Sequence, residues 1–304
     1  MNQFSVTILG SSSAIPTSAR FSSAQIVSHL SKLFLIDCGE GTQIQIRRNQ
    51  IRFSKINRIF ISHMHGDHFF GLIGLISSFN LLGRENDLHI YAPEDIKKVL
   101  DLQLLVSQSN LNYKIQYHFL EFDTKHLIFE DKHLEIYSFP LNHSVPTCGF
   151  LFAEKPHARK IRKEVLKIYD IPNHAFEGIK QGNDFVNDNG DVVSNNLLTK
   201  SGPARKSYAY CSDTAYYEAI TDYIQDVDLL YHECSFMEDM RKTAEAKKHS
   251  TTLDAARAAN NVNAKKLIIG HFSARYKDLN PVLIETQSVF ENTILAIENL
   301  KIDI

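Results

Sequence analysis

The sequence predicts an α/β (α+β) fold in which two stacked β-sheets lie between outer layers of helices. The first observation is that the chain contains two runs of short apolar segments, one in its first third and one towards its C-terminal end. Such segments, bounded by small and polar residues, are typical of buried strands. The second observation is that helical patterns separate these segments. Two sheets, each covered by helices on its outer face, agree with both observations.

The first run reads as strands joined by tight turns. The expected strands are Phe4–Leu9, a hairpin of Ala24–Val27 and Lys32–Ile36, then Ile56–Ile61, Leu88–Tyr91 and Leu134–Phe139. The pattern predicts helices over Thr42–Arg48 and over the mostly apolar segment Phe69–Leu82. We expect the second of these helices to hold in place the loop that precedes it.

The second run begins at Tyr208, with a strand that leads to Asp213. Further strands are expected over Asp228–Tyr231 and Lys266–Ile269, and helices over Ser250–Asn260 and at the C-terminal end. Together, the two runs predict the four-layer αββα arrangement.

A change of composition at about residues 154–206 predicts an insertion within a single domain that spans residues 1–304. Its first part is basic, and Ile161, Val165 and Ile168 recur there at helical spacing, which predicts an amphipathic basic helix. Its second part, Gly182–Pro203, is rich in Asn, Asp, Gly and Ser and has a turn signal at Asp188-Asn189-Gly190. We interpret the insertion as an arm that projects from the core. The alternative is a solvated helix followed by a variable loop.

The composition is that of a globular protein, with 43% hydrophobic and 22% charged residues. No apolar run reaches the length of about 18 residues that a membrane-spanning helix needs, and the first residues lack the features of a signal peptide. Four widely spaced cysteines read as buried thiols. We therefore expect a cytoplasmic protein without a membrane partner. The net charge of −2 restricts any nucleic-acid-binding surface to a local patch.

The most informative segment is His63-Met64-His65-Gly66-Asp67-His68, directly after the apolar run Ile56–Ile61. Imidazole and carboxylate are metal ligands. His63 and His65 share a face if the chain is extended there, whereas Asp67 and His68 follow the turn at Gly66 and face a second point. The segment thus predicts ligands for two neighbouring metal ions. The alternative is a polar loop that is rich in histidine by chance.

Three more polar residues follow apolar runs in the same way. They are His143, Asp213 and His271. Ligands placed at strand ends are held by a rigid backbone. A single histidine in such a place is more often structural, but together with the loop these residues are candidate ligands.

At this point the chain resembles the metallo-β-lactamase superfamily, whose HxHxDH signature it matches in full. The resemblance implies that His63, His65 and His143 bind one zinc ion, that Asp67, His68 and His271 bind a second, and that Asp213 bridges them. Asp37 corresponds to the family's early Asp, which supports the metal loop. Manganese is an alternative metal for nitrogen and oxygen ligands.

Several segments narrow the resemblance to the ribonuclease Z family, the tRNA 3′-processing endonucleases, in their short form. They are Gly10–Thr17, Asp37–Gln43, Asn142–Pro146, Tyr210–Thr214, His232-Glu233, His249–Thr251 and His271–Tyr276. The resemblance implies precursor tRNA as substrate, bound in part by the basic arm, and a homodimer. The arm departs from the family pattern because Ile171–Phe176 lacks the usual Gly-Pro pair.

A mechanism follows from this chemistry. Metal ions lower the pKa of a shared water, so hydroxide is available to attack the phosphorus at neutral pH. The family assigns Asp67 the role of accepting the proton of that water. His249, oriented by Glu233, is the candidate that protonates the departing 3′-oxygen. For the His249–Glu233 pair, the alternative is a purely structural hydrogen bond.

Two other functions compete with this one. A phosphodiesterase or esterase of the same fold could act on a small substrate, but such a substrate needs no remote docking arm. A relative that binds RNA without metal is opposed by the complete set of candidate ligands. Whether an encoded CCA blocks cleavage is left open by the sequence.

Overall fold

The computed structural model describes residues 4–304, which form two compact units. The first, here called the sandwich unit, consists of residues up to 130, 135–152 and 206–304. The second, here called the arm unit, consists of residues 131–134 and 153–205. None of the helices within residues 4–304 is both long and apolar enough to cross a membrane.

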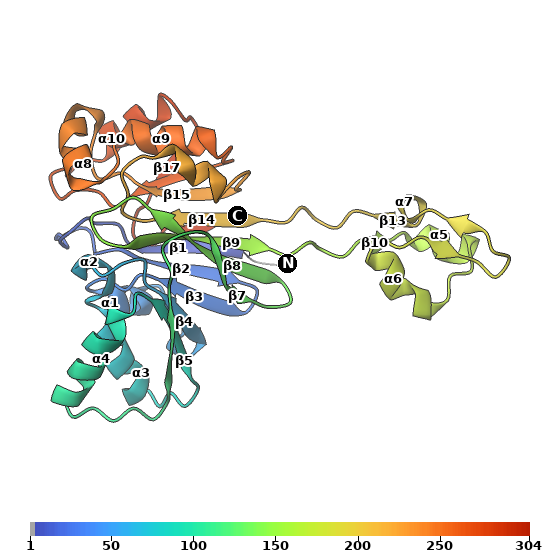
Figure 1. The fold of residues 1–304 in the computed structure, drawn as a ribbon, viewed down its shortest axis with the longest axis horizontal. Helices are drawn as coiled ribbons and strands as arrows, with labels where there is room; N and C mark the ends of the chain where they lie inside the picture. Colours follow the sequence, from blue (N-terminus) through green and yellow to red (C-terminus); the bar gives the residue numbers. More distant parts are fainter. Residues whose placement is uncertain (1–3) are drawn as a thin grey trace. The chain divides into compact units, whose positions relative to one another are not determined.

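The sandwich unit contains two seven-stranded sheets (Figure 1). In the first sheet the order is β18-β1-β2-β3-β4-β5-β6, and in the second it is β17-β16-β15-β14-β9-β8-β7. The strands of the first sheet are β1 (Phe4–Gly10), β2 (Ala24–His29), β3 (Lys32–Ile36), β4 (Ile56–Phe60), β5 (Leu88–Ala92), β6 (Ile115–Phe119) and β18 (Lys301–Asp303). Those of the second are β7 (His126–Glu130), β8 (Leu134–Leu141), β9 (Thr147–Glu154), β14 (Ser207–Cys211), β15 (Leu229–Glu233), β16 (Leu267–Gly270) and β17 (Thr293–Leu295).

The two sheets stack through buried aromatic rings. Phe34 of the first sheet lies 5.7 Å from Phe152 of the second, and Phe60 lies 5.5 Å from Phe150, measured between ring centroids. Successive side chains of a strand point to opposite faces, so the neighbours Leu35 and Ile59 belong to the core on the helix side. Strands buried on both faces explain the nearly continuous apolar runs in the sequence.

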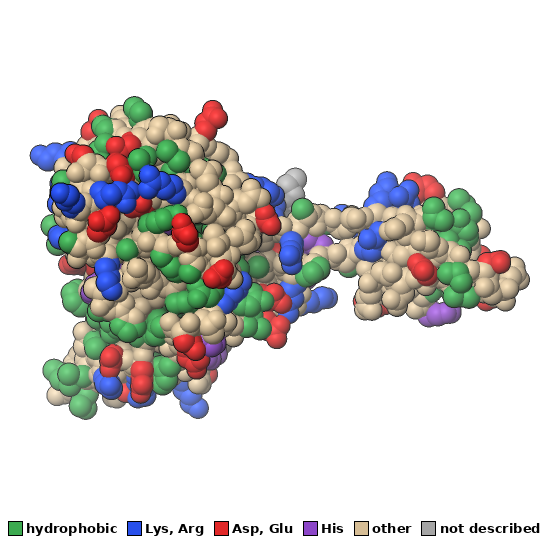
Figure 2. Space-filling model, turned by 45° about the horizontal axis from the view of Figure 1, so that its top comes forward, with side chains coloured by type: hydrophobic (Ala, Val, Ile, Leu, Met, Phe, Trp, Pro, Cys, Tyr) green, Lys and Arg blue, Asp and Glu red, His purple; other side chains and the backbone are tan. Residues whose placement is uncertain are grey.

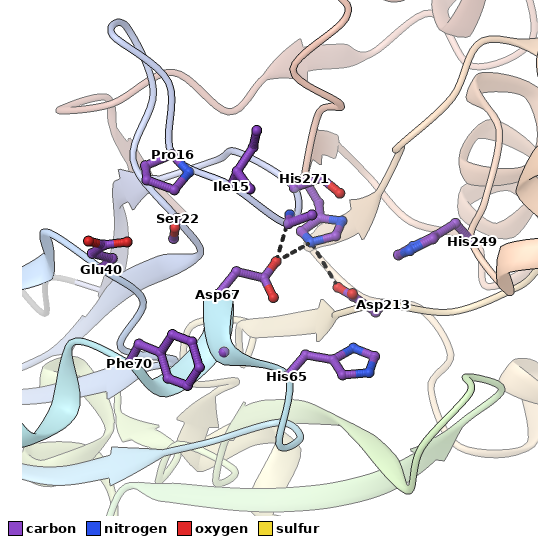
Figure 3. A pocket seen from close by; sticks show the side chains of 13 residues that line it. Ile15, Pro16, Ser22, Glu40, His65, Asp67, Phe70, Asp213, His249 and His271 are labelled. Atoms are coloured by element: carbon purple, nitrogen blue, oxygen red, sulfur yellow. Dashed lines mark hydrogen bonds and ion pairs between the residues drawn. The ribbon is translucent and has the colours of Figure 1, made fainter.

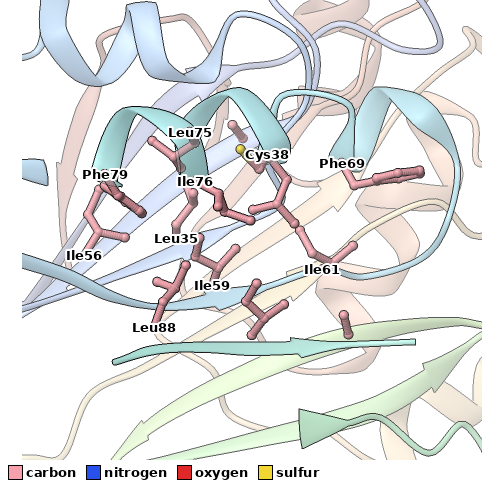
Figure 4. Packing of buried hydrophobic residues seen from close by; sticks show 14 of the residues in the cluster. Leu35, Cys38, Ile56, Ile59, Ile61, Phe69, Leu75, Ile76, Phe79 and Leu88 are labelled. Carbon is pink, nitrogen blue, oxygen red and sulfur yellow. The ribbon is translucent and has the colours of Figure 1, made fainter. Parts of the chain in front are cut away.

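Helices cover the outer face of each sheet, which confirms the predicted four-layer arrangement. On the first sheet they are α1 (Thr42–Arg48), η1 (Phe53–Lys55), α2 (Gly66–Phe69), α3 (Leu72–Leu81) and α4 (Asp95–Val106). Figure 4 shows the apolar core beneath them, in which Leu75, Ile76 and Phe79 of α3 pack over Ile59 of β4. On the second sheet they are η3 (Glu218–Asp222), η4 (Glu238–Met240), α8 (Arg241–Lys247), α9 (Thr252–Asn261) and α10 (Asn280–Gln287).

Two predictions about helices need correction. The expected helix Phe69–Leu82 starts later, because Phe69 ends α2 and α3 begins only at Leu72. Between them, the N–H of Gly71 donates to the carbonyl of Cys38, outside the helix, at 2.9 Å. The prediction of a helix at the C-terminal end was incomplete, because α10 is followed by the short strands β17 and β18. Strand β18 pairs antiparallel with β1.

The arm unit has a small core of its own, made by Val165, Ile171, Ile179, Phe185, Val193 and Leu198. Its elements are β10 (Lys160–Ile161), α5 (Lys163–Ile168), η2 (Asn173–Ala175), α6 (Phe176–Lys180), β11 (Phe185–Val186), β12 (Val192–Val193), α7 (Asn195–Leu198) and β13 (Thr199–Lys200). The predicted amphipathic helix is therefore wrong in its extent. Ile161 lies in β10, which pairs with β13, and Ile168 is exposed.

Candidate active site

The candidate ligands lie where strands of both sheets end. His63 and His65 follow β4, and Asp67 and His68 lie in the short helix α2. His143 follows β8, Asp213 follows β14 and His271 follows β16, all three in the second sheet. The structure brings all seven side chains together, although they come from segments about two hundred residues apart in the sequence.

Four of these side chains form a first cluster, in which the potential ligand atoms lie within 4.8 Å of one another. They are His63, His65, His143 and Asp213. His143 Nε2 lies 3.2 Å from His65 Nδ1, and both His63 Nε2 and His143 Nε2 lie 3.7 Å from Asp213 Oδ2. Three imidazoles and one carboxylate oxygen thus point at one volume.

A second cluster consists of Asp67, His68 and His271. Oδ2 of Asp67 lies 3.5 Å from Nε2 of His68 and 3.4 Å from Nε2 of His271. The other oxygen of Asp213, Oδ1, lies 3.2 Å from His68 Nε2 and 3.1 Å from His271 Nε2. Each oxygen of Asp213 therefore faces a different cluster, which is the arrangement that a bridging ligand requires.

The hydrogen bonds of the imidazoles leave one nitrogen of each ring directed at a cluster. Nδ1 is held by a neighbour in four of them: by Ser62 in His63, Asp37 in His68, the Lys248 carbonyl in His143 and Ser235 in His271. Nε2 of His63 and of His68 is buried and has no hydrogen-bond partner. A buried polar atom without a partner is costly, whereas a metal ion would satisfy both. Metal-binding histidines are oriented in this way by a hydrogen bond to the second nitrogen, so the residues fit a metal centre.

Asp37 anchors the metal loop from a fully buried position. Its Oδ1 accepts a hydrogen bond from the backbone N–H of Ser62 at 2.8 Å. Its Oδ2 accepts from the hydroxyls of Ser62 and Tyr210 at 3.0 and 2.7 Å, and lies 2.8 Å from His68 Nδ1. This carboxylate is therefore well placed to hold a proton on Nδ1 of His68, so that Nε2 is the nitrogen that faces the cluster.

Burial and charge shift the pKa values of the cluster in opposite directions. Burial, together with the charge of His68, lowers the pKa of His63 well below its usual value, which keeps the ring neutral. Burial also opposes ionisation of Asp213, but His271 and His68 outweigh it and lower the pKa of Asp213 well below the usual range. The carboxylates Asp213, Asp67 and Asp37 similarly outweigh burial and raise the pKa of His68.

His249 and Glu233 lie beside the clusters. His249 Nδ1 is 2.7 Å from Oε1 of Glu233, which is fully buried at the end of β15. Burial by itself lowers the pKa of His249, but the charge and hydrogen bond of Glu233 outweigh it and raise the pKa to about 9. The ring of His249 also lies 5.0 Å from that of His143 and 5.5 Å from that of His271. The buried carboxylate of Glu233 thus favours the protonated form of His249 next to the candidate metal centre.

The sequence reasoning missed several groups that support the site. The backbone N–H of Ala14 donates a hydrogen bond to Asp67 Oδ2 at 2.8 Å. Ala14, Asp37 and His271 all have left-handed backbones, with φ of 61°, 53° and 60°. Ser62, Ser235 and Lys248 hold the histidine rings. The signals in the sequence were the family-like segment Gly10–Thr17, which contains Ala14, and the positions of Ser62 next to His63 and of Lys248 next to His249.

A cavity of about 540 Å³ opens onto these residues (Figure 3). His65, Asp67, Asp213, His249 and His271 line one part of it. The remaining lining comes from the loop at Ser13–Pro16 and from Ser22, Glu40, Gly66 and Phe70. Four of the candidate ligands, His65, Asp67, Asp213 and His271, are therefore accessible to a substrate from this cavity.

Comparison with known proteins gives one family model that matches the first half of the chain and several relatives that match its whole length. A family model described as anti-Pycsar protein Apyc1 matches residues 4–156. A ribonuclease Z of Bacteroides thetaiotaomicron is 46% identical, and the aligned residues cover 100% of this chain and 96% of that protein. A ribonuclease Z of Porphyromonas gingivalis is 44% identical, with 100% of both chains covered.

Solved structures show the same fold. Human tRNase Z, short form, superposes with a TM-score of 0.71 at 24% identity, covering 98% of each chain. The metallo-β-lactamase fold protein YhfI of Bacillus subtilis gives a TM-score of 0.69 at 17% identity, covering 100% of each chain. These structures confirm the predicted metallo-β-lactamase fold, and the full-length relatives confirm the predicted family. The chain belongs to the family of the Apyc1 model through its first half and, over its whole length, to the ribonuclease Z family.

Proposed function

We propose that the chain is a metal-dependent endoribonuclease that removes the 3′ trailer from precursor tRNA. The products would be a tRNA with a 3′-hydroxyl and a trailer with a 5′-phosphate. In a chain of the ribonuclease Z family, the observation that carries the proposal is the position of Asp213, whose two oxygens face two separate clusters of histidines. Paired metal sites of this kind suit the hydrolysis of phosphodiesters.

The proposed cofactors are two Zn²⁺ ions per chain, with Mn²⁺ as the alternative. The nitrogen and oxygen donors of the two clusters suit either ion. When bound, such ions supply a water of lowered pKa and offset negative charge on the phosphate oxygens. Metal analysis of the purified protein tests the number and identity. A content below one metal ion per chain would contradict the proposal.

The protein's own groups handle the protons. Asp67, whose carboxylate lies in the cavity, accepts the proton of the attacking water. His249 donates a proton to the departing 3′-oxygen, and Glu233 keeps the imidazole charged and oriented. The new bond joins the water oxygen to phosphorus, and the bond between phosphorus and the 3′-oxygen breaks.

The arm unit is proposed to bind the body of the tRNA. Basic side chains are exposed along its surface, among them Lys160, Lys163, Lys167, Lys180 and Lys200. Figure 2 shows Lys and Arg side chains on the arm unit together with acidic and neutral ones. Contacts from Lys and Arg to phosphates add affinity without sequence preference and weaken with salt. The arm is thus suited to hold a large RNA while a separate site cuts it.

A homodimer is proposed as the working form. An apolar surface on α3 and α4 supports it, since Leu81, Leu105 and Val106 are 86%, 74% and 74% exposed. Large exposed apolar surfaces commonly mark interfaces. Light scattering of the purified protein tests this, and a monomer at micromolar concentration would contradict it.

The four cysteines are free and buried, which supports the reducing cytoplasm as the location.

Cleavage assays with two substrates test the proposed function. The protein should cut a precursor tRNA that carries a trailer directly after the discriminator nucleotide, the last unpaired nucleotide before that trailer. Bis(p-nitrophenyl) phosphate serves as the small substrate. Hydrolysis of the small ester without cleavage of the precursor would instead support a phosphodiesterase or esterase for small substrates. Repeating the assay with a precursor that encodes CCA would show whether CCA prevents cleavage.

A further inference from the structure

One end of the cavity differs chemically from the end that holds the candidate metal ligands. Ile15, Pro16 and Phe70 line it, together with the carboxylate of Glu40 (Figure 3). Neither lysine nor arginine lines the cavity among the described residues. A carboxylate repels phosphate groups, so this end is unsuited to the RNA backbone. An apolar wall beside a hydrogen-bond acceptor suits a nucleobase instead.

Phe70 is the most exposed aromatic residue of the cavity, with 65% of its surface accessible. An isolated phenylalanine in water gains nothing from such a position, because burial of its ring would be favourable. In single-strand-binding proteins, exposed aromatic rings serve as platforms on which bases stack. Base stacking would therefore explain why Phe70 is exposed beside the proposed RNA-cutting centre.

The ring of Phe70 is also held in place. It lies so close to Gly66 that a Cβ atom there would be 2.1 Å from the ring, and it meets Phe69 edge-to-face at 5.0 Å. The backbone around it is fixed by hydrogen bonds from Cys38 N–H to the His68 carbonyl and from Gly71 N–H to the Cys38 carbonyl, at 2.7 and 2.9 Å. A platform that is already positioned loses little entropy when it binds a base.

The position of His249 decides which nucleotide this platform would hold. In Figure 3, His249 lies on one side of Asp67 and Asp213, and Phe70 and Glu40 lie on the other. His249 donates to the departing 3′-oxygen, so the discriminator nucleotide belongs on its side. The phosphate stays on the trailer after cleavage. The first trailer nucleoside therefore extends from the centre in a different direction from the discriminator nucleotide.

We propose that Phe70 forms a base-binding subsite for the first trailer nucleotide, with Ile15 bounding the opposite wall of the cavity. This inference rests on the proposed function, since it requires RNA cleavage at this centre. Stacking is available to all four bases. The subsite would therefore position the scissile phosphate without requiring one particular trailer sequence.

A double-mutant cycle tests the subsite. Single-turnover cleavage is measured with wild-type protein and with Phe70→Ala, each on a precursor with a normal first trailer nucleotide and on one with an abasic residue there. Phe70→Ala should lower kcat/KM on the normal precursor by about 5- to 150-fold, the range for loss of one stacked base. The abasic residue should lower wild-type cleavage similarly, and the two changes together should cause no further loss.

Controls distinguish a failure of the subsite proposal from a failure of the proposed function. Phe119→Ala removes a half-exposed ring on β6 outside the cavity and should leave cleavage unchanged. Phe70→Trp should retain activity, and the metal content and melting temperature of each variant exclude a disrupted fold. Equal losses by Phe70→Ala on both precursors, or coupling to an abasic discriminator instead, would overturn the subsite. Absence of cleavage by the wild-type protein would overturn the proposed function itself.

Discussion

Replacing Asp37 by Asn tests how the structure orients its metal ligands. The carboxylate satisfies the N–H and O–H of Ser62, the hydroxyl of Tyr210 and Nδ1 of His68. An amide has only one oxygen, so in either orientation its NH₂ group meets at least one of these donors. A buried donor left without an acceptor costs about 1–3 kcal/mol of folding free energy. Asparagine tolerates the left-handed backbone at this position, so the loss comes from the side chain.

The same change should weaken metal binding by about 10- to 100-fold, the usual effect of losing a partner that orients a metal-binding histidine. Chelator competition measures the affinity, and urea unfolding measures the stability. Tyr210→Phe is the matched control, because it removes one hydrogen bond to the same oxygen but keeps the charge beside His68. Because the acceptor is a carboxylate, the change should cost about 1.5–3 kcal/mol, and it should leave metal affinity unchanged. Wild-type metal affinity in Asp37→Asn would refute the reasoning.

Three further outcomes are expected. Asp67→Ala should slow cleavage of precursor tRNA at least about 100-fold while a gel shift still detects binding, and loss of binding would argue against its role. Glu233→Gln should lower the pKa of His249 from about 9. Because a general acid works only below its pKa, the fall in cleavage rate at alkaline pH should move to lower pH. An unchanged pH profile would exclude His249 as the general acid. Deleting residues 155–202 should raise KM for the precursor about tenfold or more but spare bis(p-nitrophenyl) phosphate; equal loss of both would reject the arm.

The candidate ligands were predictable because their pattern is local. His63–His68 carries most of the information within six residues, and apolar strands mark the positions of His143, Asp213 and His271. The supporting groups were not predictable in this way. The N–H of Ala14 reaches Asp67 only through the folded loop, and a backbone donor leaves no trace in residue type.

Parts of the fold were missed for similar reasons. Helix α4 buries only Ile96 and Leu100, while the apolar Leu102 and Leu105 face solvent, so its amphipathic pattern is blurred. Strands β17 and β18 have three residues each, too few to show an alternating pattern. In the arm, Ile161 has helical spacing but pairs with Thr199, a contact between residues distant in the sequence.

The left-handed backbones of Ala14, Asp37 and His271 have a consequence for the abundance of the protein. Each left-handed backbone lowers the free energy of unfolding by on the order of 1 kcal/mol or more. Together, the three residues remove a large share of the stability of an ordinary domain. A ligand that binds only the native state shifts the folding equilibrium towards it. Metal supply would thus set how much folded protein a cell retains, and starvation for metal would expose the chain to proteolysis as well as stop its chemistry.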